Sequence, residues 1–161
     1  QMKKMICAFT AATHPSQVTP FTRMYNNDEI DAELVPQGTL AERLRCAAAG
    51  IGGFYTPTSV GTELAEGKEH REFNGRMHVL ELPLPGDYGL IRAWKADTAG
   101  NLVFRLTQRN FNPLMAMAAT VTIVEVENDI VEAGELDPDA IHVAGIYVDR
   151  LVCIPEDGIW I

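Results

Sequence analysis

Basic residues are scarce in this chain. Its 161 residues include 13 Lys and Arg against 22 Asp and Glu, so the formal net charge is −9. Electrostatic attraction to nucleic acid or to an anionic membrane is therefore not expected. The sequence also lacks a run of about eighteen apolar residues, which a membrane-spanning helix needs. We expect one globular domain over residues 1–161, because the length suits a single core and 47% of the residues are hydrophobic.

Cysteine is also sparse. Cys7, Cys46 and Cys153 are odd in number and far apart. This pattern argues against a disulfide framework and against a zinc ribbon, and it suits the reducing cytoplasm. We interpret the three cysteines as buried thiols. The start of the sequence has none of the charged, apolar and small-residue succession of a signal peptide, so none is expected.

The short motifs of many catalytic sites are missing. There is no Gly-x-Ser-x-Gly nucleophile elbow and no Gly-x-Gly-x-x-Gly dinucleotide fingerprint. The histidines form no close pair of the kind that binds zinc; they are His14, His70, His78 and His142. We therefore expect no metal and no permanently bound cofactor.

Alternating apolar residues and turn residues predict short strands joined by short helices. The predicted strands are residues 5–10, 31–35, 54–57, 69–73, 76–82, 88–95, 102–105, 120–127 and 146–152. Helices are predicted over 21–27, from Thr39 onwards, and from Asn110 or Asn112 to about 119. Asn74-Gly75 suits the type I′ turn of a hairpin. The pattern indicates an α/β fold with an open, mixed and mostly parallel sheet flanked by helices.

The stretch from Leu34 to Pro57 is the first place to look for a site. It reads as a strand end, a tight turn at residues 36–38, a helix that Thr39 caps, and a glycine-containing return to a strand. Open α/β folds bind ligands at such strand-to-helix crossings. Gln37 is the first candidate, because its amide can donate hydrogen bonds to a developing oxyanion in acyl transfer. The sequence shows no nucleophile beside it.

Three glycines follow that helix: Gly50, Gly52 and Gly53 surround Ile51. They either make a tight connection or let a ligand or another backbone approach closely. A helix C-cap alone would need only one glycine. The residues leave both alternatives open.

Several segments together resemble a known family. They are VPQGTLAER at 35–43, AGI at 49–51, FYTPT at 54–58, AEGKE at 65–69, AWKAD at 93–97, RNFNP at 109–113 and GELDP at 134–138. They look like the A (alpha) subunit of class I coenzyme A transferases, of the succinyl-CoA:3-oxoacid and 3-oxoadipate type. The resemblance extends from Gln1 to about Val152 and implies the NagB/RpiA-like fold of that family.

The resemblance also implies a division of labour between the alpha subunit and a homologous B (beta) subunit. In the family, the nucleophile that attacks the acyl-CoA is a glutamate of the beta subunit, and an anhydride and then a glutamyl-CoA thioester carry CoA to a second acid. Gln37 matches the alpha-subunit glutamine that supports the oxyanion together with a backbone amide from the beta subunit. Substrate or CoA contacts are expected at Gly38, Gly50, Gly52, Gly53 and Phe54. Coenzyme A thioester is then a substrate.

Two departures from the family lead to two hypotheses. The family's alpha subunit starts well upstream, with a first strand and a glycine-rich GGFGxxGxP loop, so the fold is expected to be truncated at its N-terminus. Residues 153–161 do not align, and Ile159-Trp160-Ile161 reads as an apolar tail that packs on a sheet edge or a partner. The chain is either an A-type half that needs the beta subunit in a homo- or hetero-oligomer, or an inactive member that self-associates as an assembly module.

Overall fold

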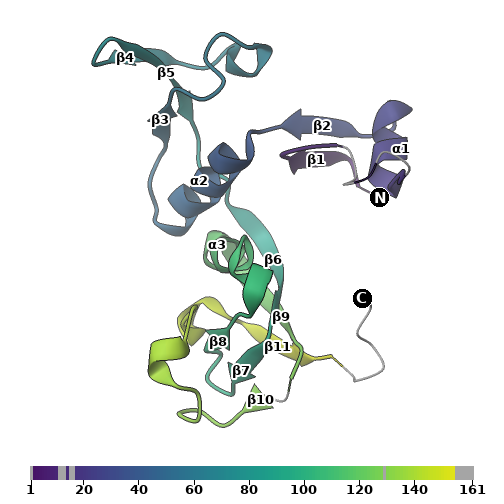
Figure 1. Ribbon diagram of the computed structural model, residues 1–161, viewed down its shortest axis with the longest axis vertical. Helices are drawn as coiled ribbons and strands as arrows, with labels where there is room; N and C mark the ends of the chain where they lie inside the picture. Colours follow the sequence, from purple (N-terminus) through teal and green to yellow (C-terminus); the bar gives the residue numbers. More distant parts are fainter. Residues whose placement is uncertain (1, 11–13, 15–16, 129, 155–161) are drawn as a thin grey trace. The chain divides into compact units, whose positions relative to one another are not determined.

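The computed structural model describes residues 2–10, 14, 17–128 and 130–154 (Figure 1). The apolar tail predicted at the C-terminus lies outside these residues. The chain divides into two compact units: Gln1–Arg43 with Gly53–Leu82, and Leu44–Gly52 with Pro83–Ile161. The described strands are short and belong to four small sheets, two of which are wholly parallel. The α/β class predicted from the sequence is confirmed.

A strand–helix–strand segment opens the first unit. Strand β1 (Lys4–Cys7) pairs in parallel with β2 (Asp31–Leu34), and helix α1 (Pro20–Asn26) connects them. The Thr19 hydroxyl accepts the Thr22 N–H at 3.1 Å, and Pro20 stands in the first turn, where a helix needs no donor. The predicted strand at 5–10 is too long, because β1 ends at Cys7.

The first unit also contains an antiparallel sheet. Its strands, in the spatial order β3-β5-β4, are β3 (Phe54–Thr56), β4 (His70–Phe73) and β5 (Arg76–Glu81). Asn74 and Gly75 join β4 to β5 with φ of 51° and 76°, the backbone that a type I′ turn requires. The predicted hairpin is confirmed. A 3-10 turn, Glu63–Ala65, lies in the connection between β3 and β4.

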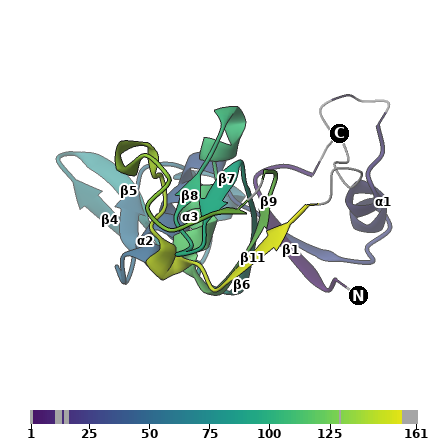
Figure 2. The ribbon, with the colours of Figure 1, turned by 90° about the horizontal axis from the view of Figure 1, so that it is seen from below.

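Three parallel strands form the main sheet of the second unit, and Figure 2 shows the last of them in the chain as a yellow arrow. Strand β9 (Ala119–Val126) lies between β6 (Gly86–Ala93) and the edge strand β11 (Arg150–Cys153). Helix α3 (Asn112–Ala118) directly precedes β9 and packs on β6 and β9. The β-branched run of β9 therefore occupies the centre of this sheet.

The core of the second unit is built on one face of this sheet. Its largest fully buried side chain is Phe104; the other buried members are Ile91, Ala93, Ala96, Leu102, Ala116, Val124, Val126 and Val143. Alternate residues of β6 point the other way, so Tyr88 and Leu90 are 69% and 70% exposed. A second small sheet has the order β10-β7-β8, from Ile130–Val131, Lys95–Asp97 and Leu102–Val103.

A turn in the second unit explains an error in the predicted last strand. The first half of the predicted strand 146–152 lies in a 3-10 turn, Gly145–Tyr147, and β11 begins only at Arg150. The Gly145 N–H donates to Asn101 Oδ1 at 3.0 Å, and a Cβ at Gly145 would lie 1.9 Å from the Ala99 carbonyl oxygen. This contact between distant segments holds the backbone out of the sheet. Other 3-10 turns are Leu106–Arg109 and Pro138–Ala140.

The cysteine prediction is correct in part. Cys7 and Cys46 are buried, but Cys153 is exposed. Its strand, β11, lies at the edge of its sheet, where side chains have fewer neighbours. All three thiols are free.

The close contact at Gly145 leads to a stability prediction. Gly145→Ala should lower the free energy of unfolding by about 3 kcal/mol, because the added methyl must push two backbone segments apart. The midpoint of urea unfolding measures this change. Gly52→Ala, in the same unit, is the matched control: its Cβ meets no atom within 4 Å, so a change within about 0.5 kcal/mol is expected. Equal effects of the two variants would contradict the prediction.

Candidate functional site

Gln37 is the first residue of helix α2 (Gln37–Ala48). The Val35 N–H donates to the Cys7 carbonyl at 2.9 Å, which extends the β1–β2 ladder beyond β2. The Pro36 carbonyl then accepts the Leu40 N–H at 2.9 Å, so the helix begins at once. The predicted turn at 36–38 and the Thr39 cap are therefore wrong. Thr39 lies inside the first helical turn, with only 6% of its surface exposed.

Gln37 is exposed at the N-terminus of a helix. Gln37 and Gly38 are both exposed, at the N-terminus of α2 and just beyond the carboxyl end of β2. The first N–H groups of a helix have no partner within the helix, and the helix dipole favours negative charge there. A Cβ built on Gly38 meets no atom within 4 Å, so the backbone is open to approach. This end of α2 can hold a developing anion.

Gly50 lies at the other end of α2 and caps it. Its φ is +66°, its N–H donates to the Ala47 carbonyl, and the Ile51 N–H donates to the Cys46 carbonyl at 2.9 Å. This pair of bonds is a Schellman motif, which favours glycine at that position. The 12 residues of α2 separate Gly50 from the start of the helix, about 18 Å along the axis. The structure therefore does not bring the predicted site residues Gln37 and Gly50 together.

Gly53 is needed where two strands approach each other. Its φ is +154°, and a Cβ there would lie 2.9 Å from the Glu81 carbonyl oxygen and 3.2 Å from Leu80 Cδ1. Phe54 follows as the first residue of β3 and pairs with Glu81 of β5. Gly52 has no such requirement: it is exposed and has open space around its Cα. The tight-connection alternative thus accounts for Gly50 and Gly53, and not for Gly52.

A group of charges missed from the sequence links Glu33 of β2 to β1 and to α2. Glu33 of β2 accepts hydrogen bonds from Lys4 Nζ at 2.6 Å and from Arg43 Nη1 at 2.9 Å. Arg43 Nε also donates to the Leu82 carbonyl at 2.9 Å. The hydrogen bonds from Lys4 and then Arg43 lower the pKa of Glu33 below its ordinary value of 4.5. The sequence does not show these pairs, because the pairing of β1 with β2 brings Lys4 near Glu33 and the packing of α2 brings Arg43 near it.

A groove of about 550 Å³ runs beside β2 towards the start of α2. Its lining comes from β1, β2 and the loop before β4: Lys4, Asp31, Ala32, Glu33, Leu34, Val35, Leu64 and Lys68. The Lys68 ammonium is paired with the buried carboxylate of Glu81 at 2.5 Å. The cations Lys4 and Lys68 of this groove thus already have carboxylate partners.

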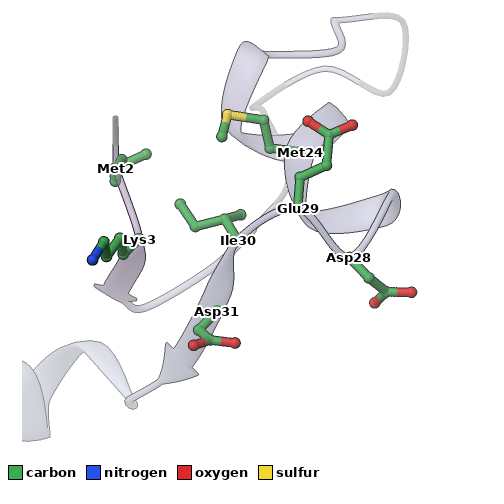
Figure 3. Close-up of a pocket in the computed structure, with 7 residues that line it drawn as sticks. All are labelled: Met2, Lys3, Met24, Asp28, Glu29, Ile30 and Asp31. Carbon is green, nitrogen blue, oxygen red and sulfur yellow. The ribbon is translucent and has the colours of Figure 1, made fainter.

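A second hollow lies at the opposite end of β2, before the strand begins (Figure 3). Its volume is about 500 Å³, and it is lined by Met2, Lys3, Met24, Asp28, Glu29, Ile30 and Asp31. Figure 3 shows the carboxylates of Asp28 and Asp31 directed away from Met24. This second hollow lies at the amino end of a parallel strand, whereas α/β folds bind ligands at the carboxyl ends of their strands. We therefore place the candidate site at Gln37 and not in this hollow.

In the second unit, a carboxylate near the ends of β6 and β9 is neutralised internally. Glu127 Oε1 accepts hydrogen bonds from Arg92 Nε at 2.8 Å and from Gln108 Nε2 at 2.9 Å. Among the described residues, no group of three or more His, Cys, Asp or Glu is arranged to hold a metal ion. Within that same part of the chain, no helix is long and apolar enough to span a membrane.

Comparison with known proteins identifies the family. The coenzyme A transferase family model matches residues 1–153. The chain belongs to this family. It is 57% identical over 152 residues to the A (alpha) subunit of the probable succinyl-CoA:3-ketoacid coenzyme A transferase of Bacillus subtilis (strain 168), covering 94% of this chain and 61% of that protein. It is 49% identical over 153 residues to the A (alpha) subunit of the 3-oxoadipate CoA-transferase of Pseudomonas putida, covering 95% and 64%.

A solved structure supports the fold. Glutaconate coenzyme A-transferase from Acidaminococcus fermentans superposes with a TM-score of 0.78 at 22% identity, over 95% of this chain and 55% of that one. At this identity the likeness shows the fold alone. The chain spans about three fifths of the length of the curated relatives it matches. Both curated relatives are named as transferase subunits, so they give no support to the inactive assembly module.

The charges around Glu33 make stability depend on pH. Because the pKa of Glu33 is lower in the folded state, the ionised carboxylate stabilises the fold above about pH 4.5, and this contribution is lost as the pH falls through the folded-state pKa. Glu33→Gln should therefore destabilise the protein at pH 6, and the difference from wild type should shrink as the pH falls below about 4.5 and through the lowered pKa of Glu33. Urea unfolding at a series of pH values measures it. Glu66→Gln, at an exposed glutamate of the same unit, should show no such trend; a constant deficit for Glu33→Gln would contradict the prediction.

Proposed function

We propose that this chain acts as the alpha-subunit part of a coenzyme A transferase that moves CoA between succinyl-CoA and a 3-oxoacid. The observation that carries the proposal is the 57% identity, over 94% of the chain, to a relative named for this reaction. The relative named for 3-oxoadipate is less similar, at 49% identity. A 3-oxoacid is therefore the acceptor class in the proposal, and a single acid is not specified.

We place the nucleophile on a partner, the beta subunit. Both relatives are named as one lettered subunit of their enzyme, which implies a second subunit in a hetero-oligomer. Three carboxylates of this chain, Glu33, Glu81 and Glu127, are held in ion pairs and are poor candidates for attack on a thioester. The free thiols are compatible with a cytoplasmic enzyme.

The proposed chemistry is acyl transfer through a covalent intermediate. The glutamate carboxylate of the partner attacks the thioester carbonyl of succinyl-CoA, and the tetrahedral oxyanion expels CoA thiolate to leave a mixed anhydride. The thiolate attacks the glutamyl carbonyl, which releases succinate and forms a glutamyl-CoA thioester. The 3-oxoacid carboxylate then attacks the glutamyl-CoA thioester, which forms a second mixed anhydride and releases CoA thiolate. The thiolate attacks the 3-oxoacyl carbonyl of this anhydride, which frees the glutamate and gives the CoA thioester of the 3-oxoacid. CoA thioester is thus a substrate, and no resident cofactor is required.

Gln37 would stabilise the oxyanions of these steps. Its amide N–H donates to negative charge without giving up a proton, and the N-terminus of α2 adds a favourable dipole. Gly38 and Gly52 are proposed as backbone contacts for the acyl-CoA, because each has open space beside its Cα. Gly50, Gly53 and Phe54 complete the proposed contacts, although the two glycines also have structural reasons for their identity.

The central test is Gln37→Ala in the full-length protein assembled with its beta subunit. CoA exchange between succinyl-CoA and acetoacetate, or 3-oxoadipate, should lose about a hundredfold in kcat, with little change in KM, because the lost hydrogen bond forms mainly in the transition state. Gln17→Ala is the matched control, since Gln17 is also exposed but lies in the loop before α1. Its kcat should equal that of wild type.

Two outcomes would count against the proposal. If the wild-type complex exchanges CoA with neither acid, the proposed reaction is wrong. If exchange occurs and Gln37→Ala retains full kcat, the reaction stands and the role of Gln37 is wrong. Size-exclusion chromatography of each variant with the beta subunit verifies that assembly is intact.

A further inference from the structure

The side chain of Arg43 ties helix α2 to two strands of its unit. One nitrogen, Nη1, donates to Glu33 on β2, and another, Nε, donates to the carbonyl of Leu82, directly after β5; both distances are 2.9 Å. The Arg43 side chain is only 12% exposed. A planar guanidinium held in two directions restricts both the rotation and the translation of the helix that carries it.

Gln37 depends on such restraint. It is an exposed residue in the first turn of α2, where the helix lacks half of its hydrogen bonds and tends to fray. On its N-terminal side, the hydrogen bond from Val35 to Cys7 fixes the backbone. On its C-terminal side, Arg43 follows six residues later, about 9 Å along the helix axis. At that spacing Arg43 can affect Gln37 only by orienting the helix.

Lys4 provides a natural contrast. It binds the other oxygen of the same Glu33 carboxylate, Oε2, at 2.6 Å. Lys4 belongs to β1, and 53% of its side chain is exposed. Removing Lys4 takes one cation from Glu33, as removing Arg43 does, but it leaves the link between Glu33 and α2 in place. The effect of removing a cation from Glu33 can therefore be measured separately from the effect of releasing α2.

We propose that Arg43 is a positioning residue for Gln37. Through Glu33 and the Leu82 carbonyl, it holds the first turn of α2 so that the Gln37 amide meets the oxyanion. Its effect on turnover rests on the proposed function, since Arg43 can alter kcat in this way only if Gln37 supports the reaction. The effect of Arg43 on the position of the helix does not rest on the proposed function.

The first experiment measures turnover of the complex with the beta subunit. Arg43→Gln should lower kcat about tenfold and leave KM for succinyl-CoA within about twofold, because a small displacement of a catalytic group slows chemistry more than binding. Arg43→Lys keeps the charge but cannot reach both acceptors, so its kcat should fall between those of wild type and Arg43→Gln. Lys4→Gln should leave both constants within about twofold of wild type.

A double-mutant cycle with Gln37→Ala decides whether Arg43 acts through Gln37. In the Gln37→Ala background, Arg43→Gln should cause no further loss of kcat, because the group that it positions is already gone. If the two losses multiply instead, Arg43 acts by another route and the inference is overturned.

Hydrogen exchange tests the positioning without any activity. The amides of Leu40 and Ala41 should exchange about fivefold faster in Arg43→Gln, and at the wild-type rate in Lys4→Gln. Unchanged exchange in Arg43→Gln would overturn the inference even if kcat falls. If the wild-type complex has no transferase activity, the proposed function fails, and this measurement still decides whether Arg43 holds the first turn of α2.

Discussion

The hydrogen bond from the Val35 N–H to the Cys7 carbonyl is the constraint on which the candidate site depends. It carries the β1–β2 ladder to within two residues of Gln37, and the Pro36 carbonyl then starts the α2 ladder by accepting the Leu40 N–H. No free loop separates strand from helix. The Gln37 amide therefore lies between two rigid elements, which keep its direction fixed. Stabilisation of an oxyanion depends on such a fixed direction more than on the strength of the donor.

Individual ion pairs hold neighbouring segments of this architecture together. The chain is strongly acidic, yet the carboxylate of Glu33 binds two cations, and the buried Glu81 binds Lys68. Removing one partner of such a group leaves a charge without compensation, so these contacts specify which strand lies beside which. In the second unit, Glu127 likewise accepts hydrogen bonds from Arg92 and Gln108. The carboxylates of these ion pairs have structural partners, and the proposed chemistry takes its nucleophile from the beta subunit instead.

The glycines after α2 show how one residue type serves different purposes. Gly50 has the left-handed backbone of a helix cap, and Gly53 lets β3 approach β5 more closely than a Cβ would allow. Gly38 and Gly52 have neither reason, and their surroundings are open. From the sequence these positions looked equivalent. Gly38 and Gly52 therefore combine open surroundings with no structural requirement for glycine, whereas the equally open Gly50 is needed as a helix cap.

The sequence by itself determined the features that depend on neighbouring residues or on family likeness. Asn74-Gly75 specified its turn through local backbone preference, the β-branched run of β9 specified a strand, and the motifs around Gln37 indicated the coenzyme A transferase family. Tertiary structure alone decided where α2 begins, why Gly145 turns away from the sheet, and which partners hold Glu33. These outcomes involve contacts between residues far apart in the chain, such as Lys4 with Glu33, Arg43 with Leu82 and Asn101 with Gly145, which are separated by 29, 39 and 44 positions. Local propensity carries no information about such pairs, because folding must first bring them together.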